Sequence, residues 1–502
     1  MPRERGSLSK RIVVAAAGLA LARAVLHLLL RSACGGFTFL MSPTEVERTR
    51  AALAFAAHPA FAPLGIVYWL PLQFWLEGGL FRFWPDALAV PFAVNTAASA
   101  LTAAGVVLWT AELAGEAAAL AAGVAFFFSA TSLIIGVGGS ADPLLNAAVV
   151  WALFFWARFE NSGRSSQAWL CAVCLTLGAA ARFEAWVVAG ALTAAAVLDR
   201  RRTALWPLAA AWLFPAAWCA YCAAEAGSPW AFASQTLAAE IRDLSRSTWS
   251  LSLSFLSDFL EVVPPWLAAL ALGNAFSDRR RLPRSYWFSL GAIALFYVGL
   301  HPFAMMQVDD HLWVVYLLAL PAAGACVASA LAGVAAPRRR AAAAAAAFAL
   351  LLAAESAHLS IYARYFKRFE PLTSVYMSVR SLRRAGAFSG DDAVLVELPD
   401  GRRVGVRQYG LWTLEPSMRG LFDRELRYAP EGGRIDPSGN PSALGLPRPE
   451  LAAWLKARRV RAVVAFQHDA ALAGLGWKRA GGPPEAGVWL APGDPLADRP
   501  LP

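Results

Sequence analysis

The sequence predicts an α-helical polytopic membrane protein, with about eleven transmembrane helices and a small α/β domain at its C-terminal end. Of its 502 residues, 58% are hydrophobic and only 16% are charged, a balance that excludes an ordinary soluble globular protein. Apolar runs of roughly 20 residues, long enough to cross a bilayer, recur from Arg11 to about residue 360. Beyond residue 361 charged residues, Gly and Pro become common, and the apolar runs shrink to the length of strands.

The predicted membrane spans can be placed one by one. The first follows the basic segment 1–11 and is too long for the core of a signal peptide, so it predicts an uncleaved signal anchor. We expect spans near residues 12–31, 88–111, 118–138, 141–157, 168–181, 184–199, 204–223, 258–276, 286–303, 313–334 and 341–360.

Arginine clusters between the spans predict the topology. Arg200–Arg202, Arg279–Arg281 and Arg338–Arg340 lie in short connections, as basic residues of cytoplasmic loops do. They account for much of the net charge of +10 and favour positive-inside topology over nucleic-acid binding. The N-terminus is then expected in the cytoplasm of a bacterial-type inner (plasma) membrane, and an odd number of spans places the C-terminal domain in the periplasm or outside the cell.

Two domains are expected, residues 1–360 in the membrane and residues 361–502 outside it. In the second, residues 393–397, 460–466 and 487–490 read as strands and residues 449–459 as a helix. No Gly-rich phosphate loop opens a helix there, so an accessory role facing the acceptor is expected rather than catalysis.

The long first outer loop, residues 32–87, carries two carboxylates near its start. Glu45 or Glu47 is suited to act as a general base on an acceptor hydroxyl or amine. Ser42-x-x-Glu45 also matches a helix capping box. Both interpretations stay open on the residues alone.

Two further groups fall at outer ends of predicted spans. Asp142 precedes Pro143, which suits a helix N-cap or an acid that positions the nucleophile or a cation. Arg182 lies in an apolar stretch, where an unpaired cation is costly. It either pairs with Glu184 or binds a lipid phosphate.

The sequence predicts no cofactor and no metal site. The turn Asp309-Asp310-His311 leaves divalent metal binding as an alternative. Cys171-x-x-Cys174 and Cys219-x-x-Cys222 fall within spans, and no His or second Cys pair stands at zinc-ligand spacing beside them, which favours structural cysteines.

Four motifs in order carry a family resemblance: Thr44-Glu45, Trp69-Leu70-Pro71-Leu72, Ala141-Asp142-Pro143-Leu144-Leu145 and Ala181-Arg182-Phe183-Glu184. Together they resemble the GT-C superfamily of integral membrane glycosyltransferases. The likeness covers roughly residues 10–335. It points to the branch that uses polyprenyl-phosphate sugars, with protein O-mannosyltransferases, the lipid A aminoarabinose transferase and lipopolysaccharide sugar transferases.

The resemblance implies transfer of a sugar from a polyprenyl-phosphate lipid donor to a lipid, glycan or protein acceptor at the outer face of the membrane. It implies Glu45 as the catalytic base. Thr44 replaces the usual Asp of that motif, which leaves Glu47 as an alternative base.

The resemblance also assigns supporting roles. Asp142 would assist the base, and Arg182 would hold the carrier phosphate. Many relatives have an Arg shortly before the Pro of a late span; none precedes Pro321 here, and His311 is the nearest substitute.

Two other functions remain as alternatives. A transporter or flippase of lipid-linked sugars would favour polar groups within the membrane; Arg23 and Asn95 are such groups, although most ionisable residues gather at one face. A catalytically inactive scaffold for envelope polysaccharide assembly would fit the loss of the usual Asp at Thr44.

Overall fold

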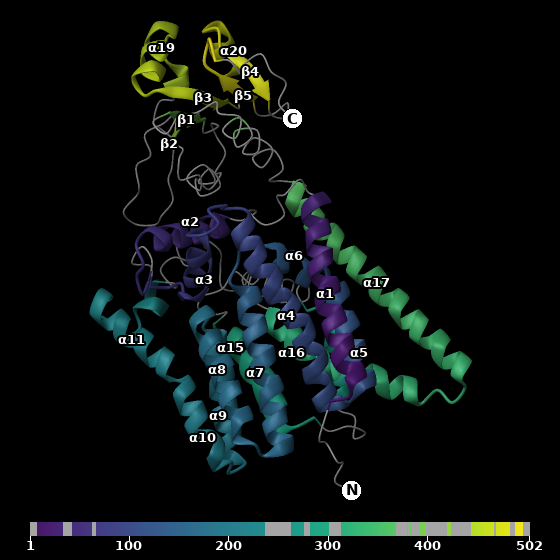
Figure 1. Cartoon of the computed structure of the whole chain (residues 1–502). Coiled ribbons are helices and arrows are strands. Elements are labelled where there is room, and N and C mark those ends of the chain that lie inside the picture. Colours follow the sequence, from purple (N-terminus) through teal and green to yellow (C-terminus); the bar gives the residue numbers. More distant parts are fainter. Residues whose placement is uncertain are drawn as a thin grey trace. The chain divides into compact units, whose positions relative to one another are not determined.

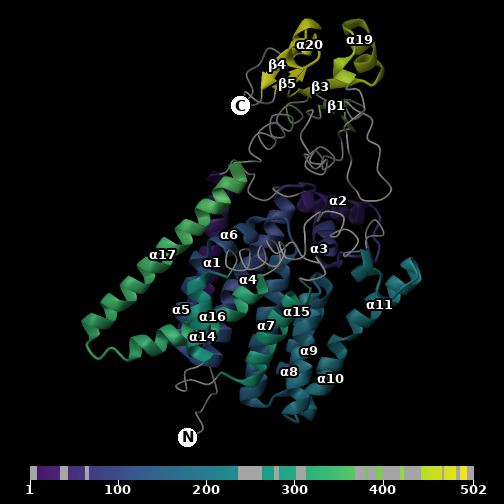
Figure 2. The ribbon, with the colours of Figure 1, turned by 180° about the vertical axis from the view of Figure 1, so that it is seen from behind.

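The computed structural model describes residues 8–33, 43–62, 67–235, 263–275, 282–300, 313–367, 379, 382, 392–397, 419–422, 443–465, 468–481 and 487–494. The chain divides into two compact units. The first comprises Met1–Phe39 and Ala54–Ser360, and the second comprises Leu40–Leu53 and Ile361–Pro502. Figures 1 and 2 show the ribbon from opposite sides.

The first unit is built mainly of apolar helices, many of which pack side by side, whereas α17 leans away from the others (Figures 1 and 2). Each predicted span overlaps one or two consecutive members of the following set of helices. They are α1 (Lys10–Ala33), α3 (Leu72–Phe81), α4 (Ala89–Ala114), α5 (Glu116–Phe128), α6 (Ala130–Val137), α7 (Asp142–Ser162), α8 (Ser165–Ala181), α9 (Glu184–Leu198), α10 (Arg202–Ala211), α11 (Leu213–Ala226), α14 (Pro265–Ala275), α15 (Arg284–Leu300), α16 (Trp313–Ala332) and α17 (Pro337–Lys367).

Within the described part of the chain, four helical segments are long and apolar enough to cross a membrane by length and composition. They are Lys10–Ser32, Ala89–Ala114, Arg202–Ala226 and Val314–Ala332. The shorter apolar helices include α5, α8 and α9. The chain is therefore a multi-pass membrane protein.

Two predicted spans are interrupted for local reasons. The span at 118–138 divides at Ser129, whose backbone is extended and whose Oγ accepts a hydrogen bond from Ser132 N at 3.2 Å; a serine in this position caps a new helix. The span at 204–223 divides at Trp212. There the ring of Pro215 crowds the carbonyl of Ala211, four residues earlier, and ends α10.

Helix α4 lies at the centre of this packing and contacts α1, α5 and α7. Its close approach to α7 depends on Gly105, because a Cβ there would lie 2.4 Å from Val150 Cγ1. Small residues of this kind let membrane helices pack backbone to backbone. Helix α7 in turn contacts α8, and α9 contacts α15, which brings the ends of these helices together.

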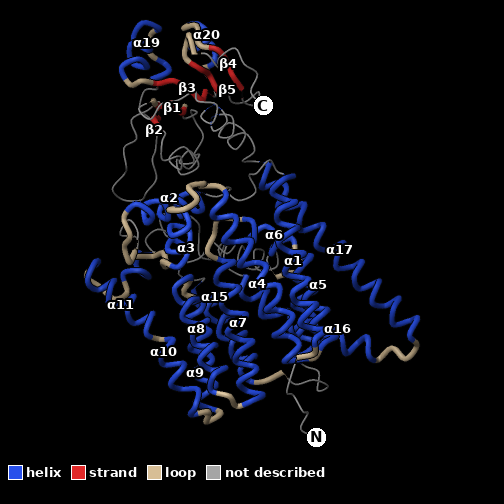
Figure 3. The backbone as a smooth tube through the Cα atoms, viewed as in Figure 1, coloured by secondary structure: helices blue, strands red, loops and turns tan. Residues whose placement is uncertain are grey.

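The second unit contains a mixed five-stranded sheet, red in Figure 3, with strand order β2-β1-β3-β5-β4. Strand β1 (Ala393–Val396) is parallel to β2 (Arg419–Phe422) and β3 (Val460–Ala465), whereas β5 (Gly487–Leu490) is antiparallel to β3 and β4 (Lys478–Gly481). Helix α19 (Arg448–Ala457) packs Leu451 and Leu455 into the core of this unit. Helix α20 (Asp469–Gly474) follows β3.

The three predicted strands and the predicted helix of this unit are confirmed. Strands β2 and β4 were not expected, because Arg419–Phe422 and Lys478–Gly481 are short and rich in basic residues and glycine. The carboxyl ends of the parallel strands β1 and β3 are joined by side chains: His468 Nδ1 lies 2.5 Å from Oε1 of the buried Glu397.

Helix α2 (Pro43–Ala57) is divided between the two units. The clustering assigns residues up to Leu53 to the second unit and Ala54 onward to the first. Glu45 therefore belongs to the second unit.

Candidate functional site

An arginine whose side chain is only 11% exposed stands at the break between α8 and α9. Arg182 is the C-cap of α8, and its extended backbone (φ −157°, ψ 155°) stops the helix before α9 begins at Glu184. The apolar runs on both sides favour helix, and the helical conformation is interrupted only at Arg182 and Phe183 between them. The break lets the guanidinium turn toward α7.

Three charged side chains meet at this break. Arg182 Nη1 lies 2.9 Å from Asp142 Oδ1, on the first residue of α7. On its other side Arg182 Nη2 donates to Glu184 Oε1 at 2.9 Å, and Nε donates to the same carboxylate. Bonds between a guanidinium and carboxylates are strong and fix geometry. Arg182 thereby holds two carboxylates from two helices in one cluster.

The two carboxylates of the cluster are buried. Asp142 and Glu184 are each 3% exposed, and the guanidinium of Arg182 contacts both of them. Burial opposes the charge of Arg182, but the attraction of Asp142 and then of Glu184 outweighs it and raises the pKa of Arg182 above its usual range. An opposite charge in direct contact favours the charged form of an ionisable group, which explains this direction.

Tyr297 completes the cluster from α15, donating its hydroxyl to Glu184 Oε1 at 3.2 Å. No signal in the sequence singles out this residue, which lies in an apolar run, Leu295-Phe296-Tyr297-Val298. Sequence reasoning therefore missed a member of the site. The start of α7, the break after α8 and the last turns of α15 together surround Arg182.

The structure brings two of the predicted site residues together, Asp142 and Arg182. The local pairing of Arg182 with Glu184, one of two alternatives open from the sequence, is present. Asp142 is not the N-cap of α7: Ala141 holds that position, and the Asp142 carboxylate meets Arg182 instead. The roles of Asp142 as an assistant to the base and of Arg182 as a phosphate ligand stay predictions.

Glu45 lies in the first turn of α2 and is half-buried, and its backbone carbonyl accepts a hydrogen bond from Thr49 Oγ1 at 3.0 Å. The side chain of Glu47 and the whole of His311 lie outside the described residues, as does Ser42 of the predicted capping box. The assignment of the base therefore stays a prediction.

A second buried arginine lies in the interior of the first unit. Arg23 of α1 is fully buried and donates to Ser99 Oγ at 3.2 Å, to Phe127 O at 2.9 Å and to Ser132 Oγ at 2.8 Å. Its guanidinium also lies 5.1 Å from the centre of the Phe126 ring. All its hydrogen-bond acceptors among the described residues are uncharged.

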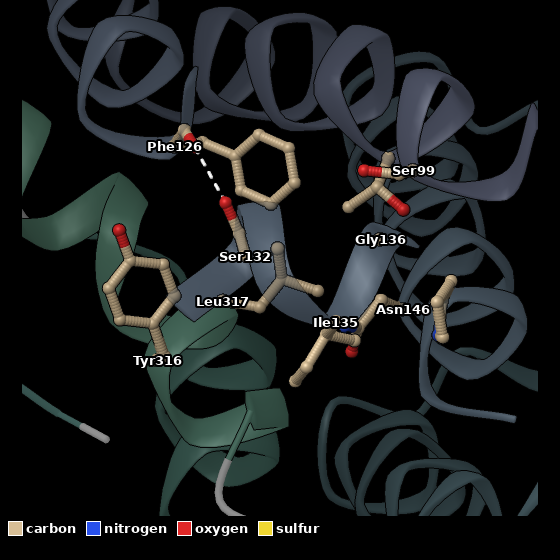
Figure 4. Close-up of a pocket in the computed structure, with 10 residues that line it drawn as sticks. Ser99, Phe126, Ser132, Ile135, Gly136, Asn146, Tyr316 and Leu317 are labelled. Carbon is tan, nitrogen blue, oxygen red and sulfur yellow. Dashed lines mark hydrogen bonds between the residues drawn. The ribbon is translucent and has the colours of Figure 1, made fainter. Parts of the chain in front are cut away.

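A small cavity adjoins this second arginine (Figure 4). Ser99 and Ser132 line it together with Asn146 and Tyr316, and its volume of about 10 Å³ is close to what one water molecule needs. Ser132 Oγ donates to Phe126 O at 2.8 Å, the dashed line of Figure 4. The cavity is too small for a sugar or a lipid phosphate.

Within the described residues, no group of three His, Cys, Asp or Glu side chains is placed to hold a metal ion. The turn Asp309-Asp310-His311 lies outside them. Cys171, Cys174, Cys219 and Cys222 are free thiols.

No protein-family model matches this sequence, and no curated protein matches it significantly. Solved structures do match its fold. ArnT from Cupriavidus metallidurans in the apo state has a TM-score of 0.50 at 12% identity, covering 94% of this chain and 98% of that chain. ArnT from the same organism bound to undecaprenyl phosphate has a TM-score of 0.53 at 12% identity, covering 96% and 98%.

A weaker likeness, with a TM-score of 0.46 at 13% identity, links this chain to an oligosaccharyltransferase from Archaeoglobus fulgidus in the apo form, covering 93% of this chain and 70% of that chain. The likeness to ArnT extends over nearly the whole of both chains, and at such low identity it establishes the fold alone. The chain therefore has the fold of ArnT.

Proposed function

We propose that this chain is a membrane glycosyltransferase that moves a sugar from a polyprenyl-phosphate donor to an acceptor. The observation that carries the proposal is the buried Asp142–Arg182–Glu184 cluster in a chain with the fold of ArnT. Buried ionised carboxylates at helix ends are expensive and are typical of functional sites in membrane proteins. The ArnT structure bound to undecaprenyl phosphate, a polyprenyl phosphate, supports the donor class.

The reaction is a direct displacement at the anomeric carbon of the sugar. The acceptor oxygen or nitrogen forms a bond to that carbon, the bond from carbon to the phosphate oxygen breaks, and the phosphate leaves with the electron pair. A carboxylate takes the proton of the acceptor as the bond forms. Configuration at the sugar carbon is inverted.

The roles proposed for single residues follow the family resemblance. Glu45 is the base, with Glu47 as the alternative, and Asp142 assists by orienting the acceptor group. Arg182 and His311 are proposed to stabilise the negative charge of the leaving phosphate. Because Arg182 already contacts Asp142 and Glu184, its contribution to phosphate binding depends on how far these two carboxylates offset its positive charge.

The proposed topology places this chemistry outside the cytoplasm. Residues 1–360 would form the transferase domain with about eleven crossings, and the N-terminus would lie in the cytoplasm of a bacterial-type inner membrane. Residues 361–502 would form an extracytoplasmic domain that guides a lipid, glycan or protein acceptor, as in the assembly of lipopolysaccharide or glycosylated protein.

The proposal is tested with the purified full-length chain in lipid nanodiscs. Sugar transfer is measured from a panel of undecaprenyl-phosphate hexoses and pentoses, in the presence of a bacterial envelope extract as acceptor. We expect Asp142→Asn and one of Glu45→Gln and Glu47→Gln to lower kcat by about 10²- to 10⁴-fold, the usual contribution of a general base and its partner.

The matched control is Glu116→Gln, which removes an exposed carboxylate from the first turn of α5 and should leave transfer unchanged. Binding of undecaprenyl phosphate, followed by native mass spectrometry, should persist in all four variants. Full activity of Glu45→Gln, Glu47→Gln and Asp142→Asn would refute the mechanism. Movement of an undecaprenyl-phosphate sugar across the bilayer without transfer would favour a flippase.

A further inference from the structure

The segment Gly138–Ser140, which joins α6 to α7, has three consecutive backbone carbonyls held by side-chain amides. Asn95 Nδ2 donates to Gly138 O and, at 3.0 Å, to Ser140 O. Gln73 Nε2 donates to the carbonyl between them, Gly139 O, at 2.6 Å. The two amides come from different helices, α4 and α3, so both helices are fastened to this one segment.

Both amides are fully buried, with 0% of Asn95 and of Gln73 exposed. A buried amide is costly unless it is hydrogen-bonded, and more so in a protein this apolar. The bonds also fix which way each amide faces. Asn95 Nδ2 lies between two carbonyl oxygens, and Gln73 Nε2 lies between Gly139 O and Glu77 Oε1, which is 2.8 Å away. A flipped amide would set oxygen against oxygen.

The held segment ends two residues before Asp142. Helix α7 has no side-chain cap, because its N-cap is Ala141. No side-chain cap therefore fixes the backbone at the helix start, whereas the carbonyls just before it are held by the two amides. Asp142 Oδ1 lies 2.9 Å from Arg182 Nη1, a distance that a small shift of this turn would change.

We propose that Asn95 and Gln73 are positioning residues, which hold the Gly138–Ser140 segment so that the carboxylate of Asp142 meets Arg182 in the geometry that transfer requires. The proposal rests on the proposed function for the role of Asp142. Each amide acts through the backbone carbonyls that it holds.

The test uses Asn95→Leu and Gln73→Met in the full-length chain, each similar in size to the residue replaced. We expect kcat for sugar transfer to fall by about 10- to 100-fold, the effect of misplacing a reacting group by a fraction of an ångström to an ångström. The KM for undecaprenyl-phosphate sugar should change by less than about threefold, because the binding surface is not altered. Amide hydrogen exchange over residues 138–142 should rise about tenfold.

The matched control is Asn161→Leu, near the other end of α7, whose amide donates to Glu112 Oε2 at 3.1 Å. It should leave kcat, KM and exchange over 138–142 unchanged. Exchange that stays at the wild-type rate in both Asn95→Leu and Gln73→Met overturns the proposal, and so does raised exchange with an unchanged kcat. If the wild-type chain transfers no sugar, the proposed function fails, and the exchange measurement alone decides whether the amides hold the segment.

Discussion

The first unit contains two arginines whose side chains are largely removed from water but whose hydrogen-bond partners differ in charge. Arg182, at the helix ends, lies between the carboxylates of Asp142 and Glu184. Arg23, in the interior, donates only to uncharged oxygens among the described residues, those of Ser99, Phe127 and Ser132. Both side chains are almost completely removed from water, so the difference lies in their partners.

The difference separates a charged site from a structural crosslink. Removing one member of a buried ion cluster leaves the others uncompensated, which is far more costly than the net contribution of the pair. Removing a cation from neutral acceptors leaves only unsatisfied oxygens. Arg182 holds two carboxylates that we propose to take part in transfer, whereas Arg23 ties α1 to α4, to α5 and to the start of α6.

The largest effect is expected from Arg182→Met. Two buried carboxylates would then lose the guanidinium that contacts both of them, which should lower the free energy of unfolding by about 3–5 kcal/mol. Transfer activity should fall by at least about 10²-fold. Unfolding is measured by titration with sodium dodecyl sulfate in mixed micelles, and transfer by the undecaprenyl-phosphate sugar assay.

A triple variant separates stability from function. Arg182→Met combined with Asp142→Asn and Glu184→Gln removes all three charges, so most of the lost stability should return while transfer stays absent. Arg182→Lys keeps the charge but loses the planar guanidinium, so its stability and its transfer activity should lie between those of the wild type and Arg182→Met. Activity in the triple variant would show that the cluster has no catalytic role.

A smaller effect is expected from Arg23→Met. Loss of the guanidinium leaves three neutral oxygens without a donor, which should lower the free energy of unfolding by about 1–3 kcal/mol. The cost is limited because a buried cation without a counter-ion is itself unfavourable. Transfer should remain within about threefold of wild type, since no carboxylate is released. A loss of kcat as large as that of Arg182→Met would contradict the distinction between the two arginines.

The sequence predicts the helices well and the site only in part. Apolar runs and arginine clusters locate the membrane helices, because membrane crossing imposes length and composition directly. The breaks at Ser129 and Trp212 depend on a single cap and a single proline, which a window of apolar residues averages away. Strands β2 and β4 lack an apolar alternation, and only pairing with their neighbours defines them.

The residues of the site also divide into those that the sequence makes visible and those that it does not. Asp142 and Arg182 are visible in the sequence because a charge in an apolar run is costly and therefore conspicuous. Tyr297, Gln73 and Asn95 differ: tyrosine and amides are tolerated in membrane helices, and their partners lie in distant parts of the chain. Asn95 is visible as a polar residue within a span, but its acceptors, two backbone carbonyls, cannot be read from residue types.

The smallest effects, and the sharpest contrast, come from two tyrosines that lie beside the two arginines. Tyr297 donates to Glu184 Oε1 at 3.2 Å, in the cluster of Arg182, and Tyr316 donates to Ala125 O at 3.3 Å, on the side of Arg23. Each loses the hydrogen bond just named on change to phenylalanine, and the loss of one such bond should lower the free energy of unfolding by about 0.5–1.5 kcal/mol. Only Tyr297→Phe should also lower kcat, by about three- to tenfold, because only its hydroxyl helps to orient a carboxylate of the charged cluster. The pair is matched in residue type and burial, so an equal loss of kcat in Tyr316→Phe would mean that the Arg23 region takes part in transfer after all.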